Sequence, residues 1–161
     1  MSLQINIGGQ VIEFPTSGES PNWGPPITQF AEAVEAALNS IVGPFDVPPQ
    51  VFVMTSNANS NVDLPNLAFP TSNVRAAFIR YSVFRTTNTN TGYEAGTIHV
   101  VYNPNGPIGN KWEIVREYEG TNEMTFNITD TGQVQFSSTA LSGTSHEGRI
   151  TYVAQALIQS E

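Results

Sequence analysis

Apolar and polar residues alternate with a period of two through most of the chain from Val51 onward, and this pattern restricts the fold more than any other feature. Successive side chains of a β-strand point to opposite faces of its sheet, so the alternation predicts strands that each bury one face. Turn-forming residues such as Gly, Asn and Asp separate the alternating runs. At least six such strands predict an antiparallel β-sandwich, of jelly-roll type.

The alternation also predicts which side chains face the core. In the run RAAFIRYSVFR, Ile79, Tyr81 and Val83 face one way, and their neighbours face the other. A tight turn is expected at 130–132, and the polar stretch TSNANSNVD at 55–63 is interpreted as a loop. The other positions expected to point inward are Ile98, Val100, Tyr102, Trp112, Ile114, Tyr118, Met124, Phe126, Ile128, Val134, Phe136, Ile150, Tyr152, Ala154, Ala156 and Ile158.

The N-terminal residues predict a β-hairpin followed by an arm. Residues 3–7 and 11–14 are extended in pattern, and Gly8-Gly9 between them supplies the turn. Residues 15–26 are rich in Pro, Gly and Ser, a composition typical of a linker or of an arm laid on another surface.

One helix is predicted between this arm and a second Pro-rich joint at 43–50. Its apolar residues recur at steps of three and four, so they lie on one stripe. The stripe spans about two heptads, too few for a coiled coil that holds together alone. We expect the helix to pack on the sandwich near a subunit boundary through Ile27, Phe30, Val34, Leu38 and Ile41. The domains expected are 1–50 for hairpin, arm and helix, and 51–161 for the sandwich.

Composition excludes several classes of partner and site. The formal net charge is -8 and the chain has a single lysine, so it cannot build the basic surface that nucleic acid requires. It has no cysteine, which removes disulfides and thiolate metal sites. No run reaches the length of a membrane span, and residues 1–10 have neither a basic leader nor an apolar core of a signal peptide. We expect a soluble protein made in a cytoplasm.

No motif predicts a catalytic, cofactor-binding or metal-binding site. His99 and His146 stand alone, without a second ligand at a useful spacing. Glu113, Glu117 and Glu119 share the outward face of one strand, where carboxylates are ordinarily solvated. The chain is therefore expected not to be an enzyme, and a polysaccharide depolymerase, which would need one of these glutamates in a cleft, is the weakest alternative.

Two other patterns are also interpreted as structural. Asn57, Asn59, Asn61 and Asp63 alternate as calcium ligands do, but the tract lacks the glycine and the distal glutamate of a calcium loop. The aromatic residues of the later strands, such as Trp112, occupy inward positions, so they predict core rather than a sugar platform.

Six segments carry a family resemblance: RAAFIRYSVFRTT, YEAGTIHVVYN, KWEIVREYEG, MTFNITDTGQVQFSSTALSG and ITYVAQALI from Val74 onward, and PNWGPPITQFAEAVEAALNSIVGP before them. The first five resemble a C-terminal β-module of tailed-bacteriophage structural proteins, and the last is similar to the short helix that such proteins place ahead of it. The resemblance implies a protein of the virion surface, made in the bacterial host and commonly trimeric, either a head-decoration (cement) protein or a tail-fibre or appendage protein.

The leading hypothesis from the sequence is a trimeric, non-enzymatic capsid-decoration protein. Its N-terminal arm would bind the major capsid protein or another virion protein by adding a strand to an exposed edge. The alternative is a tail-fibre or appendage module that binds a glycan or receptor of the host surface. The residues expected at the interface are Leu3, Ile5, Ile7, Val11, Phe14, Trp23, Ile27, Phe30, Val34, Leu38 and Ile41.

Overall fold

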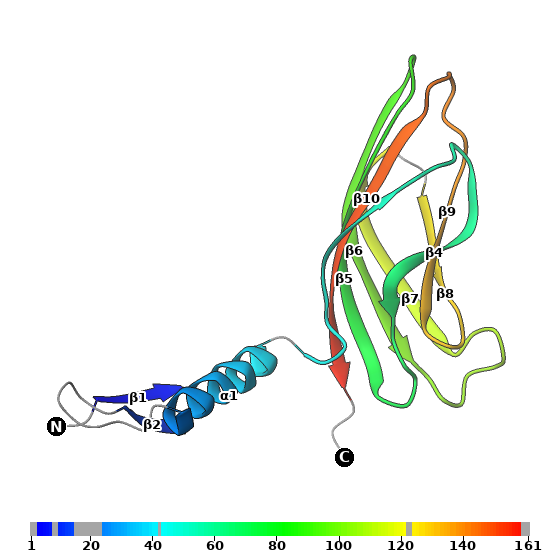
Figure 1. The fold of residues 1–161 in the computed structure, drawn as a ribbon. Coiled ribbons are helices and arrows are strands. Elements are labelled where there is room, and N and C mark those ends of the chain that lie inside the picture. The colour runs from blue at the N-terminus through cyan, green and yellow to red at the C-terminus, as the bar shows by residue number, and fades with distance from the viewer. Residues whose placement is uncertain (1–2, 8–9, 15–23, 42, 122–123, 159–161) are drawn as a thin grey trace. The chain divides into compact units, whose positions relative to one another are not determined.

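The computed structural model describes residues 3–7, 10–14, 24–41, 43–121 and 124–158. The chain divides into two compact units, Met1–Pro44 and Phe45–Glu161, and each is described here by itself. Figure 1 shows the strands and the helix along the chain.

The N-terminal unit is a hairpin with a helix packed on it. Strands β1 (Leu3–Ile7) and β2 (Gln10–Phe14) pair antiparallel, with Ile7 opposite Gln10, and helix α1 spans Gly24–Ile41. The predicted hairpin and helix are thus confirmed. None of the described helical residues form a segment long and apolar enough to cross a membrane.

The contact between helix and hairpin has its own small core, which the sequence analysis did not predict. Ile12 of β2 is 1% exposed and Ala33 of α1 is 2% exposed. The rings of Phe14 and Phe30 meet edge to face, with centroids 5.9 Å apart. A small residue at position 33 lets the helix backbone approach the two strands closely.

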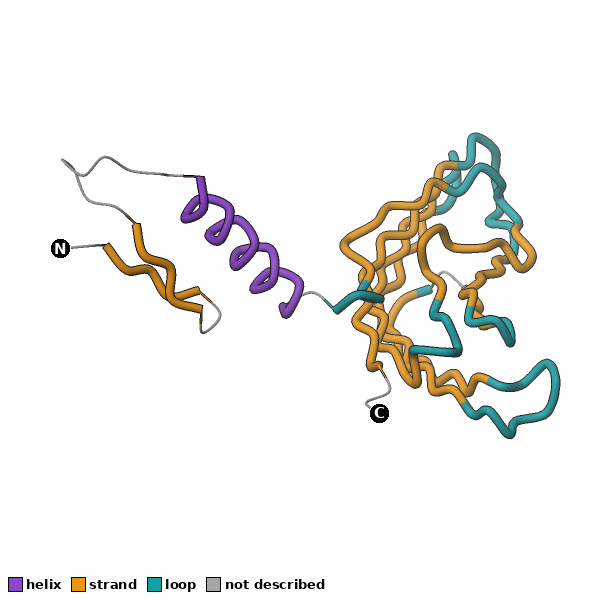
Figure 2. Tube along the Cα trace, turned by 60° about the horizontal axis from the view of Figure 1, so that its bottom comes forward, coloured by secondary structure: helices purple, strands orange, loops and turns teal. Residues whose placement is uncertain are grey.

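The second unit is the predicted antiparallel sandwich. Its larger sheet has the order β3-β10-β5-β6-β7 and its smaller sheet the order β4-β9-β8, with every pairing antiparallel. Figure 2 shows that the loops gather at the ends of the strands. The bounds are β3 Val47–Val53, β4 Asn59–Ala68, β5 Val74–Thr86, β6 Thr91–Tyr102, β7 Trp112–Gly120, β8 Met124–Ile128, β9 Gln133–Ser138 and β10 Glu147–Ile158.

The order of the strands brings the two ends of this unit together. The first strand, β3, pairs with the last, β10, and the second, β4, pairs with the last but one, β9. This pairing of early with late strands is the wrapping typical of a jelly roll. Strands β5, β6 and β7 continue the larger sheet as a simple meander.

The core lies between the two sheets and follows the predicted alternation. Ile79, Tyr81 and Val83 of β5 are each 5% exposed or less, and Phe52 of β3 packs edge to face on Phe136 of β9. Tyr118 and Ile158 were expected to face inward but are exposed. Tyr118 lies on β7, which is an edge strand, and the pairing register of β10 shifts just before Ile158.

Two predicted boundaries differ from the structure. Pro48, Pro49 and Gln50 belong to strand β3 rather than to the joint. A strand tolerates prolines at a sheet edge or at a register shift, and β3 offers both: it is the edge strand, and its pairing shifts between Tyr152 and Ala154 of β10.

The predicted loop at 55–63 is also partly wrong, because β4 begins at Asn59. This strand pairs irregularly with β9, and Asn61 and Asn66 have positive φ angles of 47° and 59°. Side chains replace part of the ladder: the Asn61 amide donates to the hydroxyl of Ser137 at 2.8 Å. The polar composition of the segment led to the prediction of a loop, because β4 is a strand held in part by side-chain hydrogen bonds.

Candidate functional site

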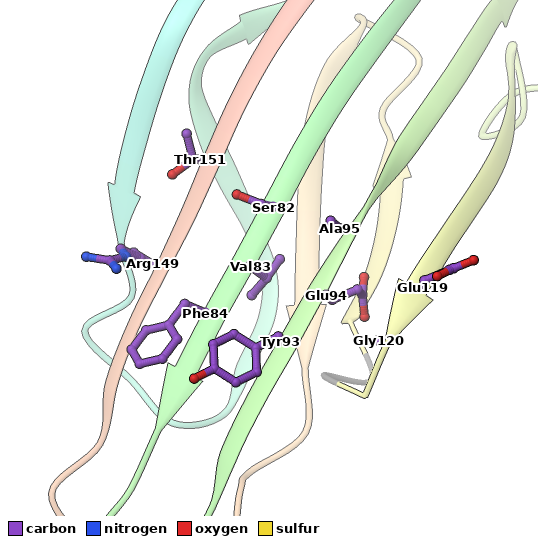
Figure 3. A pocket seen from close by; sticks show the side chains of 10 residues that line it. All are labelled: Ser82, Val83, Phe84, Tyr93, Glu94, Ala95, Glu119, Gly120, Arg149 and Thr151. Atoms are coloured by element: carbon purple, nitrogen blue, oxygen red, sulfur yellow. The ribbon is translucent and has the colours of Figure 1, made fainter.

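A groove of 690 Å³ crosses the outer face of the larger sheet, on the side away from the core. Its residues come from four neighbouring strands, β10, β5, β6 and β7 (Figure 3). The lining residues are Ser82, Val83, Phe84, Tyr93, Glu94, Ala95, Glu119, Gly120, Arg149 and Thr151.

The strand register explains why the sheet is hollow at this point. Thr151, Ser82 and Ala95 are direct partners on three adjacent strands, and together they form the groove floor. The next row outward, Arg149, Phe84 and Tyr93, forms the groove wall. Small side chains lie in one row and long side chains in the next, so the surface drops between them (Figure 3).

The groove wall presents two aromatic rings and a cation. The Phe84 and Tyr93 centroids are 5.4 Å apart with the rings tilted by 50°, and the Arg149 guanidinium carbon lies 5.2 Å from the Phe84 centroid. Tyr93 is 63% exposed. This wall therefore offers an apolar ring face beside polar groups, the combination typical of small-molecule sites.

Two smaller hollows continue the groove on the same face. One, of 260 Å³, shares Ser82 and Thr151 with the groove and adds Arg80. The other, of 310 Å³, shares Phe84 and Arg149 and adds His146. The concave surface therefore extends along β10 and β5 beyond the groove itself.

Beneath the groove lies a buried ion pair that sequence reasoning missed. The side chain of Glu94 is fully buried, its Oε1 accepts a hydrogen bond from the Tyr81 hydroxyl at 2.8 Å, and the same oxygen lies 3.4 Å from Arg116 Nη2. Arg116 also donates to the Met124 carbonyl and lies over the Tyr118 ring, 3.5 Å from its centroid. Burial, followed by the hydrogen bond to Glu94, raises the pKa of Tyr81 far above its ordinary value.

A second buried charge, Arg85, connects the segments that contain Asn57 and Thr139. Arg85 is 0% exposed, and its Nη2 donates to the carbonyls of Asn57 at 2.5 Å and Thr139 at 2.6 Å. The Asn57 side chain in turn donates to the Leu141 carbonyl and accepts from the Leu141 amide. Both Glu94 and Arg85 occupy inward positions of their alternating runs, so alternation alone could have identified them.

The residues considered for chemistry from the sequence are not brought together. Asn57 of the calcium-like tract joins loops as described, and Asn59 donates to the Ser138 hydroxyl at 3.0 Å. His99 is exposed against the ring of Phe78. The pKa of His146 is lowered by burial and then by nearby Arg85. Among the described residues, no group of three or more His, Asp or Glu side chains could hold a metal ion.

The three outward glutamates are exposed as predicted, but one of them lines a concave surface. Glu119 lies at the β7 end of the groove, whereas Glu113 and Glu117 do not line it. Sequence reasoning expected no concave site near these carboxylates. It missed the groove because the floor residues of β10 and β5 approach Glu119 only through strand pairing.

The interface expected in the N-terminal unit is only partly described. Val11 is 56% exposed, Ile27 54% and Phe30 38%, while Ile5, Phe14 and Val34 are half-buried. Trp23 and the side chains of Leu3, Ile7, Leu38 and Ile41 lie outside the described residues. The interface therefore stays a prediction.

No family model and no curated protein matches the chain. Two solved structures are similar to part of it. One is the tailspike protein of Acinetobacter phage vB_ApiP_P1, with a TM-score of 0.40 and 12% identity over 68% of this chain and 22% of that one. The other is the tailspike protein of Acinetobacter baumannii phage AM24, with a TM-score of 0.34 and 12% identity over 71% and 26%. This chain spans less than a third of either tailspike.

Proposed function

We propose that the chain is a module of a bacteriophage tail appendage, a fibre or a spike, that binds a glycan of the host cell surface in the groove. The observation that carries the proposal is the exposed aromatic wall beside a polar floor. The phage setting is supported by the resemblance of the sequence from Val74 onward to β-modules of tailed-phage structural proteins. As in such proteins, we expect a homotrimer on the virion surface.

The groove has the chemistry that a sugar ring requires. A pyranose has an apolar face of C–H groups and an edge of hydroxyl groups. The exposed Tyr93 ring offers a flat surface for the apolar face. The hydroxyls of Ser82 and Thr151 donate and accept hydrogen bonds, and the Glu119 carboxylate accepts them at the other end.

We propose binding without hydrolysis because only one of the two carboxylates near the groove is exposed to a bound sugar. A glycosidase ordinarily needs two carboxyl groups on either side of the scissile bond. Glu119 is exposed, but the Glu94 side chain is fully buried in its ion pair with Arg116. The groove therefore offers one carboxylate to a bound sugar.

An appendage is proposed ahead of capsid decoration. The decoration hypothesis depends on the N-terminal arm at 15–26, of which residues 15–23 lie outside the described part of the chain, so attachment through this arm stays a prediction. A ligand groove on the sandwich has no role in simple attachment to a capsid, but it suits recognition of a host surface.

A glycan array carrying bacterial surface saccharides tests the proposal. The unmodified protein should bind a subset of the saccharides, and Tyr93→Ala should weaken this binding by about tenfold or more because a stacked ring is lost. Val115→Ala is the matched control, since Val115 is 61% exposed on the same face but does not line the groove. Equal binding by both variants, or no binding by the unmodified protein, contradicts the proposal.

The location is tested separately by counting copies per virion with quantitative mass spectrometry. A few to a few dozen copies are expected of an appendage. Hundreds of copies would return the assignment to capsid decoration.

A further inference from the structure

We infer that the glycan bound in the groove is acidic, and that its anionic group lies over the hydroxyls of Ser82 and Thr151, between Arg80 and Arg149. This inference rests on the proposed function, since it names the class of glycan that the same groove would take. It is carried by the placement of two arginines that make no hydrogen bond or ion pair within the part of the chain that the structure describes.

Cations are scarce in this chain, and most arginines have structural partners. The sequence has six Lys and Arg residues against fourteen Asp and Glu. Arg85 is buried and hydrogen-bonded, Arg116 is paired with Glu94, and Arg75 donates to the Thr71 carbonyl at 2.6 Å. Each of these three arginines stabilises the sandwich itself.

Arg80 and Arg149 have no such role. Within the described part of the chain, neither guanidinium makes a hydrogen bond or an ion pair. Arg149 makes a cation–π contact with the ring of Phe84. Both side chains are exposed on the outer face of the larger sheet. On this face of the larger sheet two cations therefore remain available to a ligand, on a protein of net charge -8.

The strand register places these cations on either side of a pair of hydroxyls. Thr151 and Ser82 are direct partners across β10 and β5. Arg149 is two residues from Thr151 on β10, and Arg80 is two residues from Ser82 on β5, in opposite directions along the sheet. A two-residue step along a strand is about 7 Å, so each long side chain can reach toward the hydroxyls between them.

This arrangement matches an anion better than a neutral sugar. A carboxylate or phosphate accepts paired hydrogen bonds from a guanidinium and further bonds from hydroxyls. In the described residues the hydroxyls of Ser82 and Thr151 have no intramolecular partner, so they are free to donate. Glu119, at the opposite end of the groove, would repel the anionic group and so favour one orientation of the bound saccharide.

The test is binding to matched saccharides on the same array or by titration calorimetry. The probes are oligosaccharides that carry a uronic acid, oligosaccharides that carry a phosphate substituent, and neutral oligosaccharides of the same linkage. The unmodified protein should bind an acidic member at least about tenfold more tightly than its neutral counterpart, and added salt should weaken that binding. Preference for the uronic acid or for the phosphate identifies the source of the anionic group.

Charge-removing variants connect the preference to the two arginines. Arg80→Gln and Arg149→Gln should each reduce affinity for the acidic saccharide by about tenfold. Arg80 does not line the groove, so Arg80→Gln should leave affinity for the neutral saccharide nearly unchanged, whereas Arg149→Gln, in the groove wall, should lower affinity for the neutral saccharide much less than for the acidic one. Lys111→Gln is the control, because it removes the same charge from a residue that does not line the groove. Melting temperatures should stay unchanged, since both arginines are exposed.

The outcomes separate this inference from the proposed function. Binding that is lost in Tyr93→Ala but is indifferent to charge and to both arginine variants overturns the acidic class and leaves glycan binding intact. Absence of binding to every saccharide overturns both. Dissociation of an oligomer in Arg80→Gln or Arg149→Gln, seen by sedimentation, would show that a second copy of the chain uses these cations and would overturn the inference.

Discussion

The hydroxyl of Tyr81 donates a 2.8 Å hydrogen bond to the carboxylate of Glu94, and this bond joins β5 to β6 in the interior beneath the groove. The same carboxylate oxygen faces Arg116, while the other oxygen, Oε2, has no partner among the described residues. A buried carboxylate with so few partners depends strongly on each of them.

Removing the Tyr81 hydroxyl is therefore expected to destabilise the sandwich. Tyr81→Phe should lower the free energy of unfolding by about 1–3 kcal/mol, because a buried acceptor loses its donor. Tyr118→Phe is the matched control, since that ring is 51% exposed and its hydroxyl has no hydrogen bond within the described structure. Urea unfolding followed by tryptophan fluorescence measures both, and equal midpoints would contradict the role assigned to the bond.

Breaking the ion pair should cost more than removing the hydroxyl. Arg116→Met leaves the fully buried Glu94 side chain without its cation, which should destabilise the protein by about 3–5 kcal/mol. Glu117→Gln, on the same strand but exposed, should change stability by less than about 0.5 kcal/mol. Unfolding curves in urea at one pH compare the two variants directly.

Stability should fall as the pH rises above the ordinary pKa of tyrosine. Burial and Glu94 raise the pKa of Tyr81 above its ordinary value of 10.0, and burial raises that of Tyr152. An acid whose pKa is raised by folding stays protonated in the folded state while the unfolded chain loses its proton, so its stabilising contribution is complete below pH 10 and is lost at higher pH. Urea midpoints measured from pH 8 to pH 11 should decline above pH 10, and less steeply in Tyr81→Phe. Parallel curves for the two proteins would contradict the assignment.

A comparison of substitutions at Gly132 and Gly109 distinguishes the cost of backbone strain from the cost of a steric clash. Both have positive φ angles, 90° and 87°, but a Cβ at Gly132 would lie 2.0 Å from the Phe69 carbonyl oxygen, whereas a Cβ at Gly109 would meet nothing within 4 Å. Gly109→Ala should cost about 1–2 kcal/mol from conformation alone. Gly132→Ala should cost clearly more, because it also disturbs the hydrogen bond from the Phe69 amide to the Gly132 carbonyl. Thermal unfolding of both variants measures the difference.

The helix of the N-terminal unit offers a similar pair. Ala33 faces the hairpin and is 2% exposed, whereas Ala36 is exposed. Ala33→Leu should overpack the contact with the hairpin at a cost of about 1–3 kcal/mol, and Ala36→Leu should be nearly neutral. Hydrogen exchange of α1 amides in the full chain should accelerate only in Ala33→Leu. Equal protection in the two variants would show that the helix does not depend on the hairpin.

The sequence by itself determined most of the elements of this protein, β4 excepted, and most of their faces. Alternation identified which side of β5 is buried, because burial of one strand face requires apolar residues at every second position whatever lies next to it. The helix and the hairpin followed from local signals in the same way: a period near 3.6 for α1, and paired glycines between two extended runs for β1 and β2. Local geometry imposes these patterns, so a single segment reveals them.

The groove was decided by the tertiary structure. Thr151 and Ser82 lie in strands far apart along the chain, and only the pairing of β10 with β5 makes them neighbours. The alternation shows that both point outward, but it does not specify which strands pair or in which register, and a shift of two residues would keep every face and replace the floor of the groove. The alternation of their strands also shows that Arg80 and Arg149, the arginines beside that floor, point outward. Their position around one pair of hydroxyls depends on contacts between distant segments, which no local pattern encodes.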